Sequence, residues 1–417
     1  MILSVIIVNY RVRHFLELCL HSVQKALAEV GDAEILVVDN HSEDGSVEAL
    51  RPLFPQVRFL ENQENVGFAK ANNQALRQAA GEYILFLNPD TLLPEDFARA
   101  CLDFFRGTRG TGDDRGIGAV GVRMIDGSGR FLPESRRGFP SPWVAFCKLS
   151  SLSALFPRSR VFARYYLGHL SVDRTSPAPV LSGACLWTRR DILEAIGGFD
   201  ERFFMYAEDI DLSYRIEQAG YTNYYLADIT IVHFKGESTQ KDIRYIRQFY
   251  KAMSQFRRKH FDRGLPVLWS RAMETAIWVR AGIGGLSRAV KRKPAAGPSR
   301  AVKPASPGPS AMSGYEGSRP AATVDRIWPT GDPDEVERML RVLVATGDES
   351  VLVAAREQEA TRIVLCEGKA FSFKQCIKAL ETGRFYENRQ RVLFHAAGVG
   401  TAVGSADRDG KGETRVF

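Results

Sequence analysis

The feature that most constrains the fold is a regular alternation of short apolar runs with segments of helical spacing across the first 90 residues. The predicted strands lie at 4–9, 34–39, 57–60 and 83–88, and the segments of helical spacing between them lie at 15–28, 47–53 and 69–79. Continuous apolar runs are typical of strands that are buried on both faces of a parallel sheet. The alternation therefore predicts an α/β fold with a doubly wound, mostly parallel sheet.

Two acidic residues stand at the ends of predicted strands. Asp39 follows the apolar run 35–38, and Asp90 follows the run 84–87. Ligands of doubly wound sheets bind outside the carboxyl ends of the strands. Both carboxylates are therefore candidates for contact with a ligand.

The rest of the chain divides by composition. We expect strands at 117–122, 180–188, 222–226 and 229–234, a helix at 209–219, and loops with short helices at 133–175. A stretch rich in Pro, Ala, Ser and Gly precedes a second strand–helix pattern that begins near residue 326. The predicted division is an α/β domain at 1–262, an amphipathic basic helix at 263–293, a flexible linker at 294–324, a small Rossmann-like α/β domain at 325–403 and a mobile tail at 404–417.

The net charge of +7 is concentrated in one stretch of the chain. Seven basic residues and one acid lie between Gly285 and Val324, so this stretch carries six of the seven net charges. A nucleic-acid-binding protein would usually spread its basic residues over a folded face, so we expect no nucleic-acid partner. The basic stretch indicates either peripheral contact with an anionic membrane surface or a role in solubility.

The apolar patterns and the cysteines indicate a cytoplasmic protein. No run of 18 apolar residues is present, and the first residues lack a basic segment and a cleavage site, so we expect neither a membrane-spanning helix nor a signal peptide. None of the six cysteines forms a CxxC pair, and most lie among apolar residues, which favours reduced, buried thiols. We expect a cytoplasmic location, with peripheral attachment to the inner face of the cell membrane as the alternative.

Four polar stretches occur in a fixed order along the chain. They are VDNHSEDGS at 38–46, NVGFAKANN at 65–73, LNPD at 87–90 and EDIDLS at 208–213. Together with SVIIVNY at 4–10, they closely resemble family 2 glycosyltransferases of the GT-A fold, and among these the subgroup that includes rhamnosyltransferases of cell-surface polysaccharide assembly. The resemblance covers about the first 240 residues.

The resemblance implies a set of donor-side residues. Asp39 matches the aspartate that contacts the nucleotide base, and an acid at a strand end before a polar turn can accept hydrogen bonds from such a ring. The turn with Asn65 and Gly67 leads into a helix, where backbone N–H groups and Asn72 can approach the ribose or the diphosphate. For each residue of this turn taken singly, helix capping is nearly as good an explanation. The donor-side set is completed by Asn9 and Asn88.

A divalent metal, Mg²⁺ or Mn²⁺, is implied at Asp90. Departure of a nucleoside diphosphate develops charge on its phosphates, which a hard cation with oxygen ligands offsets. Asp90 matches the last acid of the DxD motif of the family, whose first position here is the neutral Asn88. A single carboxylate is a sparse metal site, and His233, in a segment that resembles the one whose histidine reaches the metal, is the candidate second ligand. The alternative for His233 is a core histidine.

The acid-rich helix start at 208–211 carries the candidate base. The acceptor hydroxyl must lose its proton as it attacks the anomeric carbon, and Asp209 matches the base of the family. Glu208 and Asp211 are expected to support it on the acceptor side, with Asp211 and Arg215 at a spacing that allows an ion pair. Gly183 lies in a small-residue stretch that resembles the strand under the acceptor, although packing explains it equally well.

These residues predict an inverting glycosyltransferase. The donor is a UDP- or dTDP-sugar, with dTDP-rhamnose as one candidate, and the acceptor is a saccharide or lipid-linked saccharide. A nucleotidyltransferase is the rival enzyme class, but the segment after the first strand lacks the glycines that such an enzyme would usually show. An inactive scaffold that binds partners through its C-terminal domain is the other rival, and the presence of Asp39, Asp90 and Asp209 argues against it.

Overall fold

The computed structural model describes residues 1–107, 116–141, 143–144, 147, 150–234, 243–261, 325–346, 351–354, 357, 360, 362–382, 391–399, 401–404 and 413–416. The predicted helix at 263–293 and the predicted linker at 294–324 lie outside these described residues.

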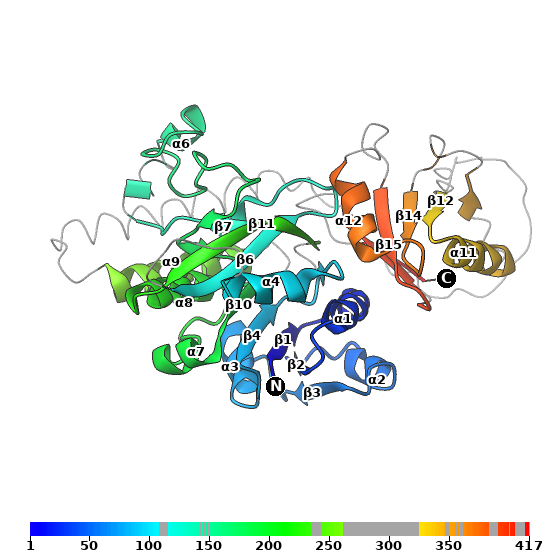
Figure 1. Cartoon of the computed structure of the whole chain (residues 1–417), viewed down its shortest axis with the longest axis horizontal. Coiled ribbons are helices and arrows are strands. Elements are labelled where there is room, and N and C mark those ends of the chain that lie inside the picture. Colours follow the sequence, from blue (N-terminus) through cyan, green and yellow to red (C-terminus); the bar gives the residue numbers. More distant parts are fainter. Residues whose placement is uncertain are drawn as a thin grey trace, which may run out of the picture.

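A nine-stranded sheet forms the centre of the first 234 residues (Figure 1). Its main path runs β3-β2-β1-β4-β10-β6-β11-β5, and β8 pairs with β11. The strands are β1 (Leu3–Asn9), β2 (Ala33–Asp39), β3 (Val57–Glu61), β4 (Tyr83–Leu87), β5 (Thr91–Leu92), β6 (Ile117–Ile125), β8 (Ser176–Pro177), β10 (Cys185–Arg189) and β11 (Thr222–His233). The strands β3, β2, β1 and β4 are parallel, and β10 runs antiparallel between β4 and β6. The predicted α/β fold with a mostly parallel sheet is confirmed.

Helices cover both faces of this sheet because successive strand residues point to opposite faces. Val5 and Ile7 pack in a core with α1 (Arg13–Leu27) and α4 (Phe97–Phe105). Ile6 and Val8 pack on the other face with α3 (Phe68–Leu76), α7 (Arg190–Ile196) and α8 (Glu208–Gln218). The remaining helical segments near the sheet are α2 (Ser46–Leu50), a 3₁₀ turn at Pro133–Ser135, and α6 (Leu152–Leu155).

Two differences from the sequence prediction shape the site. The single strand expected at 180–188 is broken into β9 (Val180–Leu181), which pairs with β7 (Arg136–Arg137), and β10. The break occurs at Ser182, whose carbonyl accepts from the Cys185 N–H at 3.2 Å. In addition, α9 (Ile243–His260) lies in a stretch for which the sequence analysis proposes no helix.

A separate six-stranded sheet is built from the C-terminal part of the chain, which confirms the predicted second α/β unit. Its order is β13-β12-β14-β15-β16-β17, and the first four of these strands are parallel. The strands are β12 (Asp325–Gly331), β13 (Val351–Val353), β14 (Arg362–Cys366), β15 (Arg391–His395), β16 (Thr401–Gly404) and β17 (Glu413–Val416). The helices of this unit are α11 (Pro333–Thr346) and α12 (Phe373–Glu381).

The sequence analysis predicts a mobile tail from residue 404, but part of this stretch forms a strand. Residues 413–416 form β17, which pairs antiparallel with β16 in the second sheet. The polar composition of the tail gave no periodic signal, but backbone hydrogen bonds to a neighbouring strand do not depend on apolar side chains.

The second sheet packs directly against the first domain, beside α1 and α4 (Figure 1). Phe234 and Phe394 meet with ring centroids 5.5 Å apart. The carboxylate of Glu95 accepts hydrogen bonds from the first backbone N–H groups of α12, at Phe373 and Lys374. Lys25 of α1 is ion-paired with the buried Glu367. The contact therefore combines apolar packing with capping of a helix terminus across the two units.

Each of the six cysteines is a buried thiol outside any disulfide, as the sequence predicts. Among the residues that the structure describes, no helix has both the length and the apolar character needed to cross a membrane.

Candidate active site

The carboxylate of Asp209 lies in the first turn of α8, where three donors hold it. Oδ2 accepts from the guanidinium of Arg137 at 2.5 Å and from the Gly183 N–H at 3.2 Å, while Oδ1 accepts from the Ile210 N–H at 2.8 Å. Both partners of the ion pair are largely buried, with side-chain exposures of 13% for Arg137 and 14% for Asp209. These donors hold the carboxylate in one orientation, with Oδ2 paired to a charged guanidinium.

The Arg137 guanidinium is fixed in the charged state. Burial acts against its charge, but the charges of Asp209 and Tyr165 outweigh burial and raise the pKa of Arg137 further above its ordinary value. The sequence analysis does not identify Arg137, because an arginine in a loop-rich stretch has no periodic pattern to mark it. Its place in β7, which is paired with β9, brings it to Asp209.

Gly183 must be small where it contacts the candidate base. A Cβ at this position would lie 3.2 Å from the Asp209 Cβ and 3.8 Å from the ring of Phe68. The break between β9 and β10 turns the Gly183 N–H toward the carboxylate. The close neighbour of Gly183 in the structure is Asp209, which agrees with the packing alternative. A place for Gly183 under the acceptor stays a prediction.

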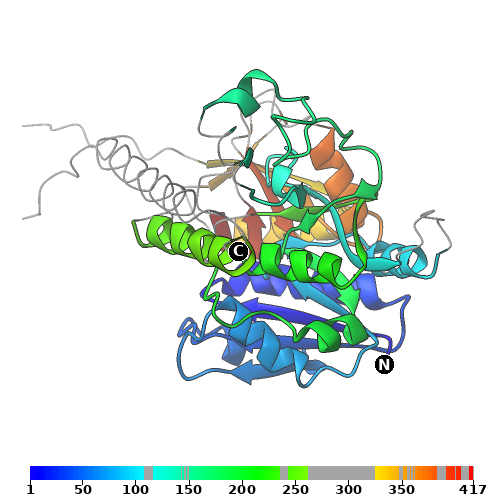
Figure 2. The same cartoon turned by 90° about the vertical axis from the view of Figure 1, so that its left-hand side faces the viewer.

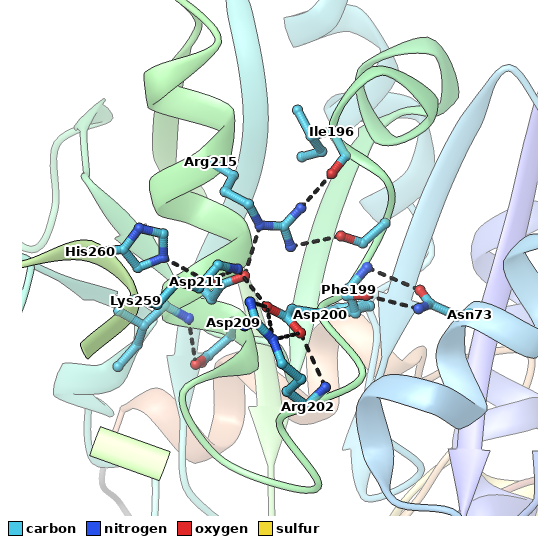
Figure 3. A network of polar contacts seen from close by, with 12 residues as sticks. Asn73, Ile196, Phe199, Asp200, Arg202, Asp209, Asp211, Arg215, Lys259 and His260 are labelled. Atoms are coloured by element: carbon cyan, nitrogen blue, oxygen red, sulfur yellow. Dashed lines mark hydrogen bonds and ion pairs between the residues drawn. The ribbon is translucent and has the colours of Figure 1, made fainter. Parts of the chain in front are cut away.

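Asp211 lies at the centre of a buried polar network (Figure 3). Its carboxylate is fully buried and accepts from Arg215 at 2.7 Å, Lys259 at 2.6 Å and His260 at 2.6 Å. The pairing of Asp211 with Arg215 that the sequence predicts is confirmed. Because both oxygens are occupied, this geometry fits a supporting role and not direct contact with an acceptor.

The same network ties the loop before α8 to α9 (Figure 3). Lys259 also donates to Asp200 at 2.6 Å, and Arg202 donates to the same carboxylate. Burial opposes the charge of Asp200, but the hydrogen bonds from Arg202 and Lys259 lower its pKa well below its usual range. Arg215 reaches the carbonyls of Ile196 and Gly198 at 2.8 and 2.7 Å. These contacts fix the first turn of α8 against the loop and α9.

Glu208 is buried beside Asp209, and one of its oxygens, Oε2, has no hydrogen-bond partner among the described residues. Burial raises the pKa of Glu208 to about 8, and the neighbouring charge of Asp209 acts in the same direction. The environment of Glu208 in the folded protein therefore favours its protonated form. Of the two adjacent acids, Asp209 is the one that is paired with a guanidinium.

The raised pKa of Glu208 predicts a pH-dependent stability. Between about pH 4.5 and pH 8 the folded state holds a proton that the unfolded state has released. The free energy of unfolding should therefore fall as pH rises through this window, by at most about 1.4 kcal/mol per pH unit. Gln is neutral in both states, so Glu208→Gln should remove this component and gain stability relative to wild type from pH 5 to pH 8.

Urea unfolding at several pH values measures this effect. Glu194→Gln is the matched control, because Glu194 is exposed on α7 and the substitution is chemically identical. If the wild type and Glu208→Gln change in parallel across the window, Glu208 is not protonated in the folded protein.

The other predicted residues gather along the carboxyl ends of the central strands. Asp39 accepts from Asn9 Nδ2 at 2.8 Å and from the Ser42 N–H at 3.0 Å. Asn40, which the sequence analysis passes over, lies beside Asp39 and donates to Asn65 Oδ1 at 2.9 Å. The residues predicted to contact the nucleotide base and the turn at Asn65 are therefore joined in one hydrogen-bond network.

The turn at Asn65 and Gly67 is shaped by a close approach to the loop before α8. Gly67 has a φ of 86°, and a Cβ there would lie 2.6 Å from the Phe204 carbonyl oxygen. That carbonyl accepts from the Phe68 N–H at 2.7 Å. Asn72 is buried, and its amide donates back to the Phe68 carbonyl at 2.9 Å. The Asn72 amide is therefore engaged within α3.

Asp90 and His233 meet at the edge of the sheet where β11 pairs with β5. His233 Nε2 lies 3.4 Å from Asp90 Oδ1 and 3.4 Å from Asn88 Nδ2. Asp90 Oδ1 and His233 Nδ1 are buried without a hydrogen-bond partner among the described residues. The described residues contain no group of three or more His, Cys, Asp or Glu side chains that could hold a metal. Asp90 and His233 thus offer two converging ligands.

Asn88 and the Gly183 segment join the two groups of acids. The Asn88 N–H donates to the Ala184 carbonyl at 2.9 Å, and Ala184 is the neighbour of Gly183, whose N–H reaches Asp209. Asn88 also stands beside His233. The Asp90–His233 pair and the Asp209–Arg137 pair therefore lie on either side of one short backbone connection.

Comparison with known proteins gives consistent matches to one family. The model of the family described as glycosyl transferase family 2 matches residues 4–197. An N-acetylglucosaminyl-diphospho-decaprenol L-rhamnosyltransferase of Mycobacterium tuberculosis is 32% identical over 253 residues, which cover 58% of this chain and 78% of the relative. The O-antigen biosynthesis protein RfbC of Myxococcus xanthus is 26% identical over 212 residues, covering 50% of this chain and 15% of that protein.

Among solved structures, the mannosyltransferase PcManGT from Pyrobaculum calidifontis in complex with GDP-Man and Mn²⁺ is 20% identical, with a TM-score of 0.44. The alignment covers 70% of this chain and 75% of that one.

Proposed function

The chain belongs to glycosyl transferase family 2, and on that premise we propose that it moves L-rhamnose from a dTDP-sugar to a lipid-linked N-acetylglucosaminyl diphosphate, with inversion at the anomeric carbon. The identity of the transferred sugar and of the acceptor is supported by the mycobacterial relative, whose name gives both. Glycosyl transfer itself follows from the family.

The observation that carries this proposal is the position of Asp209. Its carboxylate is paired with Arg137 and separated by one backbone connection from the Asp90–His233 pair. In the proposed step, Asp209 accepts the proton of the acceptor hydroxyl as the hydroxyl oxygen bonds to the anomeric carbon. The bond from that carbon to the nucleoside diphosphate breaks on the opposite side, so the configuration inverts.

Arg137 and the Asp211 network serve as positioning elements in this proposal. Arg137 orients the Asp209 carboxylate by donating a hydrogen bond of 2.5 Å to its Oδ2. Asp211, with Arg215, Lys259 and His260, fixes the helix turn that carries Asp209. A base held to a narrow geometry needs such support, because misplacement by about 1 Å can cost about 10²-fold in rate.

The donor is proposed to lie along the carboxyl ends of β1, β2 and β4. Asp39, held by Asn9, offers an oxygen edge to the nucleotide base. The turn at Asn65 and Gly67 brings backbone N–H groups near the start of α3, where a diphosphate is favoured by the helix terminus.

A divalent cation fits the residues at Asp90. Asp90 Oδ1 is buried and has no hydrogen-bond partner among the described residues, and the His233 ring faces it. Together they supply one hard and one borderline ligand. Two protein ligands leave positions for phosphate oxygens of a donor. When bound, the ion would offset the negative charge that develops on the leaving diphosphate.

The test is a transfer assay with a synthetic lipid-linked N-acetylglucosaminyl diphosphate and a panel of nucleotide sugars. We expect dTDP-L-rhamnose to be used and the product to carry the inverted linkage. A preference for a different sugar would overturn the donor assignment, and failure to turn over any nucleotide sugar, by transfer or hydrolysis, would favour an inactive scaffold.

We further propose that the protein works in the cytoplasm at the inner face of the cell membrane, where a lipid-linked acceptor is met. The sequence assigns peripheral contact to residues 263–293, which lie outside the described residues. The described residues include a second surface that combines apolar and basic side chains.

A further inference from the structure

A segment between β7 and β8 stands out from the central sheet around α6, in both views of the molecule (Figures 1 and 2). From Gly138 to Val172 the sequence contains no Asp or Glu. Four large apolar side chains in it are exposed to between 43% and 69%, at Trp143, Leu155, Phe156 and Val161. Contiguous apolar exposure of this kind on a folded domain marks an interaction site.

The exposed apolar side chains form one cluster. The ring of Phe162 lies 6.2 Å from that of Trp143 and 5.5 Å from that of Phe156, measured between centroids. Trp143 Nε1 donates to the Val161 carbonyl at 3.0 Å, which fixes the indole on the same side.

Basic side chains lie in the same segment as this cluster. Arg158, Arg160 and Arg164 are exposed, and none of them forms an ion pair with another described residue. Burial, with the charges of Arg160, Arg136 and Arg164, lowers the pKa of the nearby His169. We call the four apolar residues and these three arginines the basic-aromatic cap.

The base of the segment is anchored to the rest of the fold. Leu167 is buried in the core that also holds α8, and the Gly138 N–H donates to the Tyr165 carbonyl at 2.7 Å. At the other end, the Val172 carbonyl accepts from Tyr225 Oη at 2.7 Å.

We propose that the basic-aromatic cap docks the enzyme on an anionic lipid bilayer. Aromatic side chains with Leu and Val suit the boundary between headgroups and acyl chains, and arginines without neighbouring acids suit anionic headgroups. Binding to a protein partner of ordinary composition would not require a surface segment that lacks acidic residues over 35 positions. The charge pattern thus favours a lipid surface as the occupant.

The segment that carries the cap is connected in sequence to the candidate site. It begins directly after Arg137, whose guanidinium holds Asp209. This link rests on the proposed function: an acceptor whose diphosphate is anchored in the bilayer would then be presented to Asp209 by the surface on which the enzyme rests.

Vesicle flotation tests the proposal with full-length protein. Vesicles of phosphatidylcholine with and without phosphatidylglycerol are compared at low and high salt. The variant Arg158→Ser/Arg160→Ser/Arg164→Ser should bind the anionic vesicles about 100-fold more weakly, because each basic residue near such a surface contributes a factor of about five. The control Arg51→Ser/Arg77→Ser/Arg99→Ser removes the same charge from exposed positions on other faces and should bind nearly as the wild type does.

A second variant, Leu155→Ser/Phe156→Ser, tests the apolar contribution. It should lose the part of vesicle binding that survives high salt, since salt screens charge and not apolar insertion. A third variant replaces Arg288, Lys291, Arg292 and Lys293 with Ser. It distinguishes the contribution of the cap to vesicle binding from that of the predicted basic helix.

The proposal would be overturned if the wild type and both cap variants floated equally, or if the wild type did not float. It would also be overturned if the cap variants lost self-association and not vesicle binding, because the cap would then be a protein interface. Hydrolysis of dTDP-L-rhamnose, measured on the same variants, tests the proposed function separately from membrane docking. The cap variants should retain this hydrolysis. If the wild type did not hydrolyse dTDP-L-rhamnose, that would count against the proposed function, while the flotation result would still stand.

Discussion

Replacing Asp209 with Asn should reduce sugar transfer by roughly 10²- to 10⁴-fold, while affinity for the nucleotide-sugar donor stays close to that of the wild type. The substitution keeps a hydrogen-bond acceptor toward Arg137 and Gly183, whose donors hold the carboxylate at 2.5 and 3.2 Å. What it removes is the ability to accept a proton from the acceptor hydroxyl. Binding of the donor at the neighbouring strand ends does not require that proton transfer.

Initial rates and donor affinity, measured by calorimetry, separate the two effects. Asp191→Asn is the matched control, because Asp191 is an exposed acid in the first turn of α7 and undergoes the same chemical change. It should behave as the wild type does. Wild-type turnover in Asp209→Asn would remove Asp209 from the mechanism, and a loss of donor affinity as large as the loss of rate would make its role structural.

The part of the fold that could be predicted from the sequence is the part in which apolar residues follow a clear pattern. The stretches 4–9, 34–39 and 83–88 are strands in the structure, because short apolar runs suit strands that are buried on both faces. Asp39 and Asp90 could be located for the same reason, since Asp39 follows the apolar run 35–38 and Asp90 comes three residues after the run 84–87 ends.

The residues that orient the candidate base could not be located in this way. Arg137 reaches Asp209 through the pairing of β7 with β9, a contact between positions about 45 residues apart that no local pattern encodes. Lys259 and His260 belong to α9, where Phe249, Ala252 and Phe256 do recur at helical spacing, so this signal was available and was missed.

Glu208 and Asp209 illustrate why residue type alone does not assign a role. The two acids are adjacent in sequence and share a helix start, yet burial raises the pKa of Glu208 to about 8 while Asp209 meets a guanidinium. Their difference arises from the direction in which each side chain points, which only tertiary packing determines.

The second large effect concerns Asp90, where substitution by Ala should weaken donor binding and lower turnover by on the order of 10³-fold. The expectation follows from a cation that contributes several kcal/mol of charge stabilisation to phosphate departure. Asp90 supplies the only carboxylate of the Asp90–His233 pair, and its Oδ1 is buried with no hydrogen-bond partner in the described part of the chain. His233→Ala should have a smaller effect of the same kind, because the carboxylate remains.

Chelation and metal add-back give this prediction its sharpest form. Excess chelator should stop turnover by the wild type, and Mn²⁺ or Mg²⁺ should restore it. Asp90→Ala should respond weakly to either ion, because the remaining imidazole cannot replace a charged oxygen ligand. Donor-dependent binding of Mn²⁺, followed by electron paramagnetic resonance, provides a readout that does not depend on catalysis. Full activity of the wild type in excess chelator would show that neither Asp90 nor His233 acts through a metal.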